Sequence, residues 1–299
     1  MLQTDSRTVQ ASTIAMDTVI SIQVACVADE AVVRAALQRA LDWFATVERA
    51  CSRFDPNSEL RQLLARPGEA VQVSPVLFEA VRFALTLARQ TGGAFDPTIG
   101  PLLERRGFNR HYVTGQTITS ESADLGATYR DVRLGTGRTI TLRRPLVLDL
   151  GAVAKGLAID LAACELAEFE NFCIEAGGDL FASGHNADGM PWRVGIQDPH
   201  NPAGLATTLE VSDRAVCTSG DYRRKNANGH HLVDPRTGQS TVELASVSVV
   251  APTAMAADGL ATAAFILGLD GGRELLDQAD VQGVFITASG VLERTVSRN

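Results

Sequence analysis

One short segment has the residue types and spacing needed to bind a phosphate. Asp149 ends an apolar stretch, Leu146–Leu150, and Gly151 leads from it into a run with helical periodicity. Such a junction places backbone N–H groups and the positive end of a helix dipole at one point. Lys155 would lie about one turn into this helix, within reach of a phosphate or carbonyl oxygen. An ordinary strand–helix joint with a surface lysine explains the segment equally well.

Asp258 and Thr262 form a second pair with chemical potential. They lie four residues apart within Met255–Leu267 and would share one face of a helix, which is otherwise Ala, Leu and Ile. A carboxylate on such a face needs a partner, and carboxylate, hydroxyl and carbonyl oxygens are ligands suited to Mg²⁺. The alternative is an exposed Asp258, with the Thr262 hydroxyl bonded back to its own helix.

Two further segments combine glycine with polar or aromatic residues. Thr218-Ser219-Gly220-Asp221 follows an apolar strand and could hold phosphate or flavin polar atoms, or form a turn capped by its own hydroxyls. In Gly92–Pro97 the glycines permit close backbone approach, and Phe95 could lie against a flat ring. A helix C-cap followed by a buried Phe is the alternative for this segment.

His231 begins the motif His-Leu-Val-Asp-Pro-Arg-Thr-Gly and is one of only five histidines. It is either a satisfied core residue or a group that moves a proton. Within the motif, Arg236 either pairs with Asp234 or holds an anion. Neither G-x-G-x-x-G after the first strand nor G-x-x-x-x-G-K-[ST] occurs in the chain. A nucleotide site would therefore be built in another way.

The composition excludes some classes of protein. Of the 299 residues, 45% are hydrophobic and 21% charged, as in ordinary soluble globular proteins. The net charge of −8 argues against a nucleic-acid surface, which needs clustered Lys and Arg. The five cysteines are scattered and lack CxxC spacing, so neither a zinc site nor a disulfide framework is expected. An anionic ligand would be held locally, by N–H groups, a few cations or a metal.

Strand and helix patterns mix without strict βαβ alternation. We therefore expect an α+β fold with mixed or antiparallel sheets and packed helices. The strands are expected at Thr18–Cys26, Leu146–Leu150, Asn171–Glu175, Trp192–Ile196, Leu205–Val211, Ala215–Cys217, Ser246–Ala251 and Gly283–Thr287. The helices are expected at Asp29–Val47, from Ser74-Pro75 to Gly92-Gly93, at Val153–Glu168 and at Thr253–Leu267.

The organisation expected is one domain over residues 1–299, or two intertwined subdomains, with residues 1–12 as a flexible N-terminus. Met1–Ala15 lacks the basic and apolar regions of a secretory signal. The most apolar stretch, Leu244–Leu269, contains Pro252 and Asp258, so no membrane span is expected.

Together, these segments resemble the ApbE family of FAD:protein FMN transferases, from Met16 to Gly268. The six matching segments are residues 52–60, 91–102, 149–156, 175–179, 218–222 and 231–238. The resemblance implies a T-fold-like α+β architecture, with FAD in a central cleft and Mg²⁺ bridging the diphosphate. The family splits FAD, releases AMP and links FMN by a phosphoester to a Thr or Ser of a partner flavoprotein. The alternatives are an FAD pyrophosphatase, which forms FMN and AMP, and a non-catalytic FAD carrier.

The resemblance also implies roles for individual residues. Asp258 and Thr262 match the family's metal-binding side chains, with the carbonyl of Ala152 as a third ligand. His231 matches a motif histidine near the reacting phosphate and is the expected proton shuttle, with Asp258 as the other candidate base. The expected FAD contacts are Met16, Phe54, Ala94, Phe95, Asp96, Asp149, Lys155, Thr218, Ser219, Gly220 and Leu232.

The chain departs from the family pattern at three points. Met16-Asp17-Thr18 replaces the common Met-Gly-Thr, so an Asp side chain could crowd or repel the ligand near Met16. Phe54 replaces an aromatic residue that is often Tyr, which keeps a stacking face but loses a hydroxyl. Many relatives carry a secretion leader with a lipid-anchoring cysteine. Its absence here indicates the cytoplasm, whereas a removed leader would indicate the periplasm or membrane surface.

Overall fold

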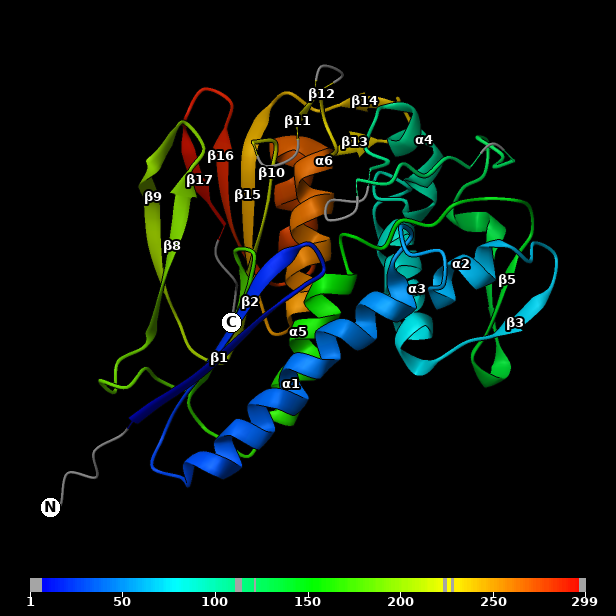
Figure 1. Cartoon of the computed structure of the whole chain (residues 1–299). Helices are drawn as coiled ribbons and strands as arrows, with labels where there is room; N and C mark the ends of the chain where they lie inside the picture. Colours follow the sequence, from blue (N-terminus) through cyan, green and yellow to red (C-terminus); the bar gives the residue numbers. More distant parts are fainter. Residues whose placement is uncertain (1–6, 111–114, 121, 223–224, 227–228, 296–299) are drawn as a thin grey trace, which may run out of the picture.

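The computed structural model describes residues 7–110, 115–120, 122–222, 225–226 and 229–295 (Figure 1). Its centre is an eight-stranded antiparallel sheet with the order β1-β2-β6-β7-β10-β15-β16-β17. These strands are β1 (Arg7–Ala15), β2 (Thr18–Cys26), β6 (Phe172–Ala176), β7 (Asp179–Ser183), β10 (Arg214–Gly220), β15 (Leu244–Ala251), β16 (Gln282–Thr287) and β17 (Leu292–Arg294).

Helices cover one face of this sheet (Figure 1). α6 (Ala254–Gln278) packs on β10 and β15, α5 (Ala154–Glu165) lies beside α6, and α1 (Glu30–Cys51) crosses over α5 (Figure 1). The apolar residues of α1 recur at helical spacing and face inward, with Phe44 fully buried. The core therefore lies between the sheet and these helices, and it fixes where the first turns of α5 and α6 meet.

Smaller elements surround this core. The helices α2 (Glu59–Leu64) and α3 (Pro75–Gln90) lie near a three-stranded sheet of β3 (Ala70–Gln72), β5 (Thr139–Leu142) and β4 (Val132–Gly135) (Figure 1). The helix α4 (Gly100–Arg105) follows a short 3-10 turn, Pro97–Ile99, that packs against α3. The hairpin β8 (Trp192–Asp198) and β9 (Asn201–Val211) packs its buried residues, such as Ile196, with Leu180 and Val216 in a second apolar cluster. Two short pairs remain, β11 (Lys225–Asn226) with β12 (Gly229–His230) and β13 (Val233–Asp234) with β14 (Gln239–Ser240).

The expected α+β class with antiparallel sheets is confirmed, and most expected elements are present with shifted ends. α3 begins after its N-cap, Ser74, and ends before Gly92 and Gly93, both of which have positive φ. α6 extends beyond the expected Leu267. At Gly268, φ is 77° and ψ is −174°, so the element bends there and then continues.

Two strand assignments differ from the structure. Leu146–Leu150 is buried except for the half-buried Asp149, but it is not a strand, because its neighbour is the turn around residues 97–100 rather than another strand. The Asp149 N–H donates to the Pro97 carbonyl at 2.7 Å. Residues 218–220, expected as a turn, continue β10 and pair with residues 246–248 of β15.

The chain start also differs from expectation. Residues 7–12 were expected to be flexible but form most of β1, which pairs with β2. Residues 1–6 lie outside the described residues. Within the part of the chain that the structure describes, α6 alone has the length and composition of a membrane span, and 67% of its apolar window is buried inside the protein. A core helix passes the same test, so this is weak evidence for a span.

Candidate functional site

The first turn of α6 is held by α5. The Asp160 carboxylate accepts hydrogen bonds from the N–H groups of Ala254, at 2.6 Å, and Met255, at 3.0 Å. Thr253 caps the same turn by accepting from Ala256. A side chain at Gly156 would collide with the Ala254 carbonyl, so only glycine allows the two helices to approach this closely. α5 and α6 therefore meet at a fixed point.

Asp258 and Thr262 lie beyond this first turn of α6, and both are buried, at 7% and 8% exposed. Their burial excludes the alternative of an Asp258 on an exposed helix face. The Ser219 hydroxyl on β10 lies 2.9 Å from the Thr262 hydroxyl. The strand position of Ser219 thus brings a third oxygen to the pair.

Lys155, in the first turn of α5, brings a positive charge to the same place. Its ammonium forms an ion pair with the Asp179 carboxylate, which is 4% exposed and also accepts from the Thr218 N–H at 2.9 Å. Burial lowers the pKa of Lys155, but the charges of Asp179 and Asp258 and the hydrogen bond to Asp179 raise it above its ordinary value. Lys155 is therefore charged at neutral pH.

The donor set here fits a hard cation in part. Asp258, Thr262 and Ser219 offer only oxygen atoms, the ligand type that Mg²⁺ prefers. Ala152 lies in the turn before α5. Among the described residues, no group of three or more His, Cys, Asp or Glu side chains could hold a metal alone. A metal would thus need ligand or water oxygens as well, as Mg²⁺ commonly does.

Asp149 is fixed by a buried arginine. The Arg53 Nε donates to Asp149 Oδ2 at 2.6 Å, and the Gly151 N–H donates to Oδ1 at 2.8 Å. Arg53 is 5% exposed, and it also contacts the Phe108 carbonyl, at 2.5 Å, and the Glu104 carboxylate, at 3.8 Å.

Arg53 also packs against the ring of Phe54, a predicted FAD contact. The Arg53 guanidinium lies 4.2 Å from the centroid of the Phe54 ring, a cation–π contact. Arg53 thus links two predicted FAD contacts, Phe54 and Asp149.

His231 lies close to this arginine group. Its ring makes an edge contact with the ring of Phe108, with centroids 6.1 Å apart, and Phe108 is the residue whose carbonyl binds Arg53. The adjacent residues are core residues: Leu232 is 4% exposed, and His230 packs edge-on against Phe265 with its Nε2 2.7 Å from the Thr241 carbonyl oxygen. Of the two neighbouring histidines, only His231 is partly exposed.

The segment around Asp96 has a largely structural role. One Asp96 oxygen accepts from the N–H and hydroxyl of Thr98, and the other accepts from the Tyr129 N–H. Burial raises the pKa of Asp96, and these hydrogen bonds act in the opposite direction. Ala94 is fully buried and Phe95 is 5% exposed. The segment thus has the geometry of a helix C-cap followed by a buried Phe, and the FAD contacts of Ala94, Phe95 and Asp96 stay a prediction.

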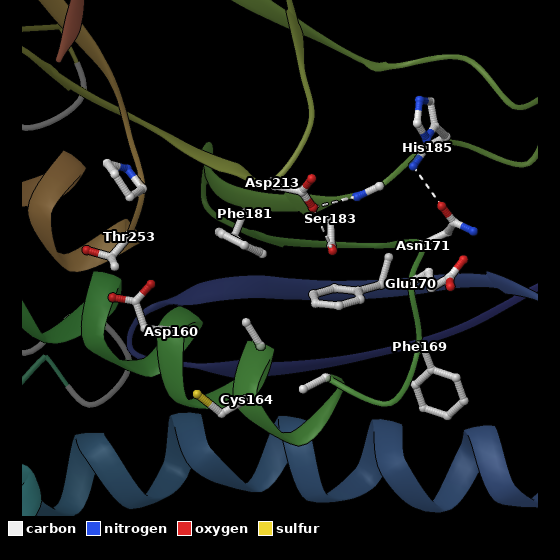
Figure 2. Close-up of a pocket in the computed structure, with 15 residues that line it drawn as sticks. Asp160, Cys164, Phe169, Glu170, Asn171, Phe181, Ser183, His185, Asp213 and Thr253 are labelled. Atoms are coloured by element: carbon white, nitrogen blue, oxygen red, sulfur yellow. Dashed lines mark hydrogen bonds between the residues drawn. The ribbon is translucent and has the colours of Figure 1, made fainter. Parts of the chain in front are cut away.

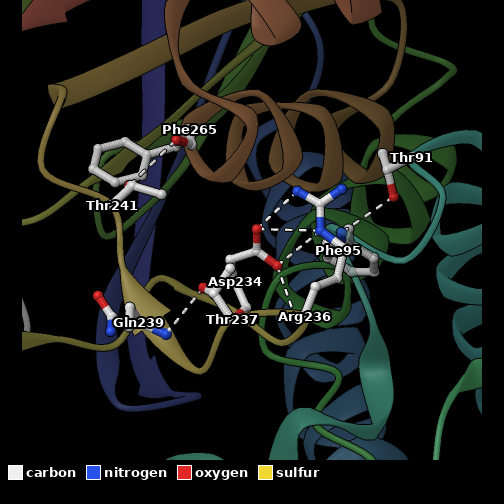
Figure 3. A network of polar contacts seen from close by, with 8 residues as sticks. All are labelled: Thr91, Phe95, Asp234, Arg236, Thr237, Gln239, Thr241 and Phe265. Atoms are coloured by element: carbon white, nitrogen blue, oxygen red, sulfur yellow. Dashed lines mark hydrogen bonds and ion pairs between the residues drawn. The ribbon is translucent and has the colours of Figure 1, made fainter.

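Asp234 and Arg236 form a forked ion pair (Figure 3). The Arg236 Nη2 lies 2.7 Å from Asp234 Oδ2, and its Nε lies 3.0 Å from Oδ1. Asp234 is 8% exposed, whereas half of the Arg236 side chain is exposed. The first of the two roles expected for Arg236, pairing with Asp234, is confirmed.

Met16 lies in the β1–β2 turn, next to the turn that precedes Asp179. Met16 and Asp17 have positive φ, 51° and 60°. Asp tolerates this conformation better than most residues, which explains how Asp17 can replace a glycine. A side chain at Gly177, in the β6–β7 turn, would meet the Thr18 side chain. Met16 and the Lys155–Asp179 pair are therefore brought to the same end of the sheet.

A pocket of about 680 Å³ lies at the opposite end of β6 and β7 (Figure 2). Phe172 at the start of β6 and Ser183 at the end of β7 line it, together with Asp160 and Cys164 of α5. None of the predicted site residues lines this pocket or a second one of about 460 Å³ beside α2. The candidate site is thus defined by side-chain contacts rather than by either pocket.

Three supporting residues were missed by the sequence analysis. Asp179 ends one of the six matching segments, residues 175–179, and Arg53 adjoins Phe54, but the ion-pair partners of both residues lie far away along the chain. Asp160 carries no motif at all. The only feature of the sequence that could have indicated a role for Asp160 is its position as an acidic residue in the middle of a largely apolar helix.

The fold and these contacts define a class of protein. It is an antiparallel α+β protein in which a buried carboxylate–hydroxyl pair, Asp258 and Thr262, lies near the ion pair of a half-buried lysine, Lys155, with the buried Asp179, where two helices meet. A phosphate-bearing nucleotide held with a hard cation suits such a junction.

Comparison with known families identifies the class more closely. Residues 16–285 match the model of the ApbE family, and the chain belongs to this family. The resemblance found in the sequence motifs is thereby confirmed.

Named relatives are similar over most of their length. An FAD:protein FMN transferase from Vibrio cholerae is 30% identical over 280 residues, 89% of this chain and 82% of the relative. The protein of the same name from Treponema pallidum is 32% identical over 296 residues, 88% of this chain and 82% of the relative.

Solved structures of ApbE proteins have the same fold as this chain. The ApbE protein of Thermotoga maritima has a TM-score of 0.84 and 28% identity, covering 98% of this chain and 100% of its own. The flavin transferase ApbE of Vibrio cholerae has a TM-score of 0.83 and 27% identity, covering 98% of each chain.

Proposed function

We propose that this chain is a Mg²⁺-dependent FAD:protein FMN transferase, which attaches FMN to a Thr or Ser of an acceptor protein and releases AMP. The observation that carries this proposal is the buried pair Asp258 and Thr262, set beside the Lys155–Asp179 ion pair. Membership of the ApbE family, whose named relatives are FAD:protein FMN transferases, supports it.

In this proposal the first requirement is to neutralise the diphosphate of FAD. Lys155 supplies a positive charge, and the N–H groups near Gly151 supply hydrogen-bond donors. Asp258, Thr262 and the Ala152 carbonyl would hold the metal. Mg²⁺, when bound, would lower the charge on the diphosphate and on the departing AMP.

The transfer step is a displacement at the phosphorus on the FMN side. The acceptor hydroxyl oxygen forms a bond to this phosphorus, and the bond from phosphorus to the bridging oxygen breaks, so AMP departs with the electron pair. The hydroxyl proton goes to a base, for which His231 is the first choice and Asp258 the second. The partial exposure of His231, compared with the buried His230, favours His231 for this role.

The remaining predicted contacts would bind FAD around this centre. Phe54 offers a ring that Arg53 holds from one side, and Asp149 is oriented by two hydrogen bonds. The buried residues Ala94, Phe95, Asp96 and Leu232 could contribute backbone atoms or shape, because little of their side chains is exposed. Met16, Thr218, Ser219 and Gly220 complete the proposed set.

A mass assay tests the proposal. The chain is incubated with FAD, Mg²⁺ and candidate acceptor proteins, and the acceptors are then weighed. We expect one acceptor to gain the mass of one FMN as AMP appears. AMP without labelling would instead identify an FAD pyrophosphatase, and intact FAD would identify a carrier. Either result would overturn the proposal.

A further inference from the structure

The outer edge of β1 has no role in the site described above. β1 ends the strand order of the eight-stranded sheet, and within the described residues no other strand pairs with its outer side. It is nine residues long, lacks proline, and has one charged residue, Arg7, at the end far from the turn. Proteins usually protect such edges, because free N–H and C=O groups can pair with another chain.

The opposite edge of the same sheet is protected. β17 has only three residues, two of which are charged. Its Glu293 is paired with Arg273 of α6. Short strands and charged side chains are two common means of preventing edge pairing. The contrast indicates that the edge of β1 is open to a partner.

The β1–β2 turn determines which backbone groups point outward. The two turn residues, 16 and 17, have positive φ, and Ala15 pairs with Thr18 across them. In two-residue hairpins the flanking pair exchanges both hydrogen bonds, and bonding then alternates along the strands. Every second residue from Ile14 back to Thr8 therefore directs its N–H and C=O away from β2.

This edge leads to the candidate site. β1 ends at Ala15, just before Met16 in the β1–β2 turn, and the adjoining β6–β7 turn, where Gly177 lies against Thr18, leads into Asp179. Asp179 is the ion-pair partner of Lys155. A strand added along β1 would thus end at the same end of the sheet as the lysine that we assign to the FAD diphosphate, with β1, β2 and β6 between the added strand and β7.

An apolar contact lies beside the turn. Ile14 and Val19 are opposite each other in the hairpin register and are 75% and 57% exposed. Directly opposed side chains on one face of a hairpin form a joint surface. This pair could receive an apolar side chain from a bound segment.

We propose that the acceptor protein binds through an extended segment that adds as a strand to the outer edge of β1, with its target hydroxyl near the β1–β2 turn. The inference rests on the proposed function, which requires a protein as second substrate. In strand addition, main-chain hydrogen bonds supply affinity and side-chain contacts supply specificity. The backbone of β1 would supply the main-chain hydrogen bonds, and Ile14 with Val19 would supply the side-chain contact.

The test uses two variants and the acceptor that gains FMN in the mass assay. Ser12→Pro removes an outward N–H while leaving the hydrogen bonds to β2 intact. Ile14→Lys keeps the backbone and places a charge at the apolar contact. For each variant we expect KM for the acceptor to rise at least about tenfold, which corresponds to about 1.4 kcal/mol, with FAD affinity unchanged. Ser12→Ala and Leu205→Lys, the latter at an exposed site on β9, are the matched controls.

Hydrogen exchange provides a second measurement. Acceptor binding should slow exchange at the outward amides of Ser12 and Ile14 in the wild-type protein. An unchanged KM in both variants, or protection only elsewhere, would overturn the inference. So would normal labelling by Ser12→Pro combined with a change from dimer to monomer in light scattering, because the edge would then bind a second copy of this chain. Failure of the wild-type protein to label any acceptor would instead reject the proposed function, and the inference with it.

Discussion

At the scale of single residues, Lys155 is the charge around which the site is arranged. Two carboxylates, Asp179 and Asp258, act on it and keep its pKa above the ordinary value despite burial. Lys155 is already paired with Asp179. In the proposed site a metal bound by Asp258 would supply the further positive charge that attracts a phosphate. Lys155, Asp179 and Asp258 together carry a net charge of −1, and a bound divalent cation would make the sum +1 in a protein whose net charge is −8.

We expect Lys155→Ala to weaken FAD binding by at least about tenfold, the effect of losing roughly 1.4 kcal/mol of interaction. A fluorescence titration with FAD measures it. Lys155→Arg is the matched control, because it keeps the charge. An affinity for FAD that is the same in the alanine variant and the wild type would remove Lys155 from the proposed site.

Arg53 is expected to act on the site through Asp149. Arg53→Ala leaves the Asp149 and Glu104 carboxylates without their cation, and breaking such a buried pair costs about 3 kcal/mol or more. Arg53→Lys keeps the charge but cannot reproduce the forked contacts to Asp149 and the Phe108 carbonyl. Urea unfolding should therefore rank stability as wild type, then lysine, then alanine. Equal stability of all three would mean that the ion pair contributes nothing.

The sequence predicted the residues that share a helix turn or a motif, and not those that meet through the fold. The four-residue spacing of Asp258 and Thr262 in an apolar run was sufficient to place them together. Arg53 and Asp149, 96 residues apart, are joined only by tertiary structure. No local pattern contains that information.

At the scale of elements, the site depends on the contact between the first turns of α5 and α6. Asp160 accepts two N–H groups of α6, and Gly156 removes the side chain that would separate the helices. Burial raises the pKa of Asp160 to about 6, although these two hydrogen bonds act to lower it.

A raised pKa predicts a pH effect with a definite sign. Because the folded protein binds the Asp160 proton more tightly than the unfolded chain, this group stabilises the fold below pH 3.8. That contribution is lost as pH rises through about 6. Asp160→Asn should thus be less stable than the wild type at pH 4. Between pH 4 and pH 7 the free energy of unfolding of the variant should rise, relative to that of the wild type, by on the order of 2–3 kcal/mol. Thermal or urea unfolding of both proteins across this range measures the difference. A difference that is constant with pH would show that Asp160 does not titrate in this range.

Elements were predictable where periodicity was strong. Thr18–Cys26 alternates and forms β2 with the expected bounds. Leu146–Leu150 has the apolar character of a strand, but its backbone bonds to a turn at Pro97. Residues 218–220 have turn-like composition, yet pairing with β15 holds them in a strand. In both cases a tertiary neighbour decided the local structure.

At the scale of the whole molecule, strands distant in the sequence converge at one end of the central sheet. The strand order brings β2 beside β6 and β7 beside β10, so that Met16, Asp179 and Ser219 lie at one end of the sheet, where Ser219 contacts Thr262 of α6. The α+β class followed from the mixture of elements, but this strand order could not, because periodicity carries no pairing information. The order is what turns separate motifs into one site.

The central claim is that α6 holds a divalent cation against the diphosphate of FAD. The most direct test measures FMN transfer to the acceptor as a function of Mg²⁺ concentration, for the wild type and for Asp258→Asn. We expect Mg²⁺-dependent transfer by the wild type and none by the variant, even though circular dichroism shows the variant to be folded. Transfer by Asp258→Asn with the wild-type rate and Mg²⁺ dependence would contradict the account.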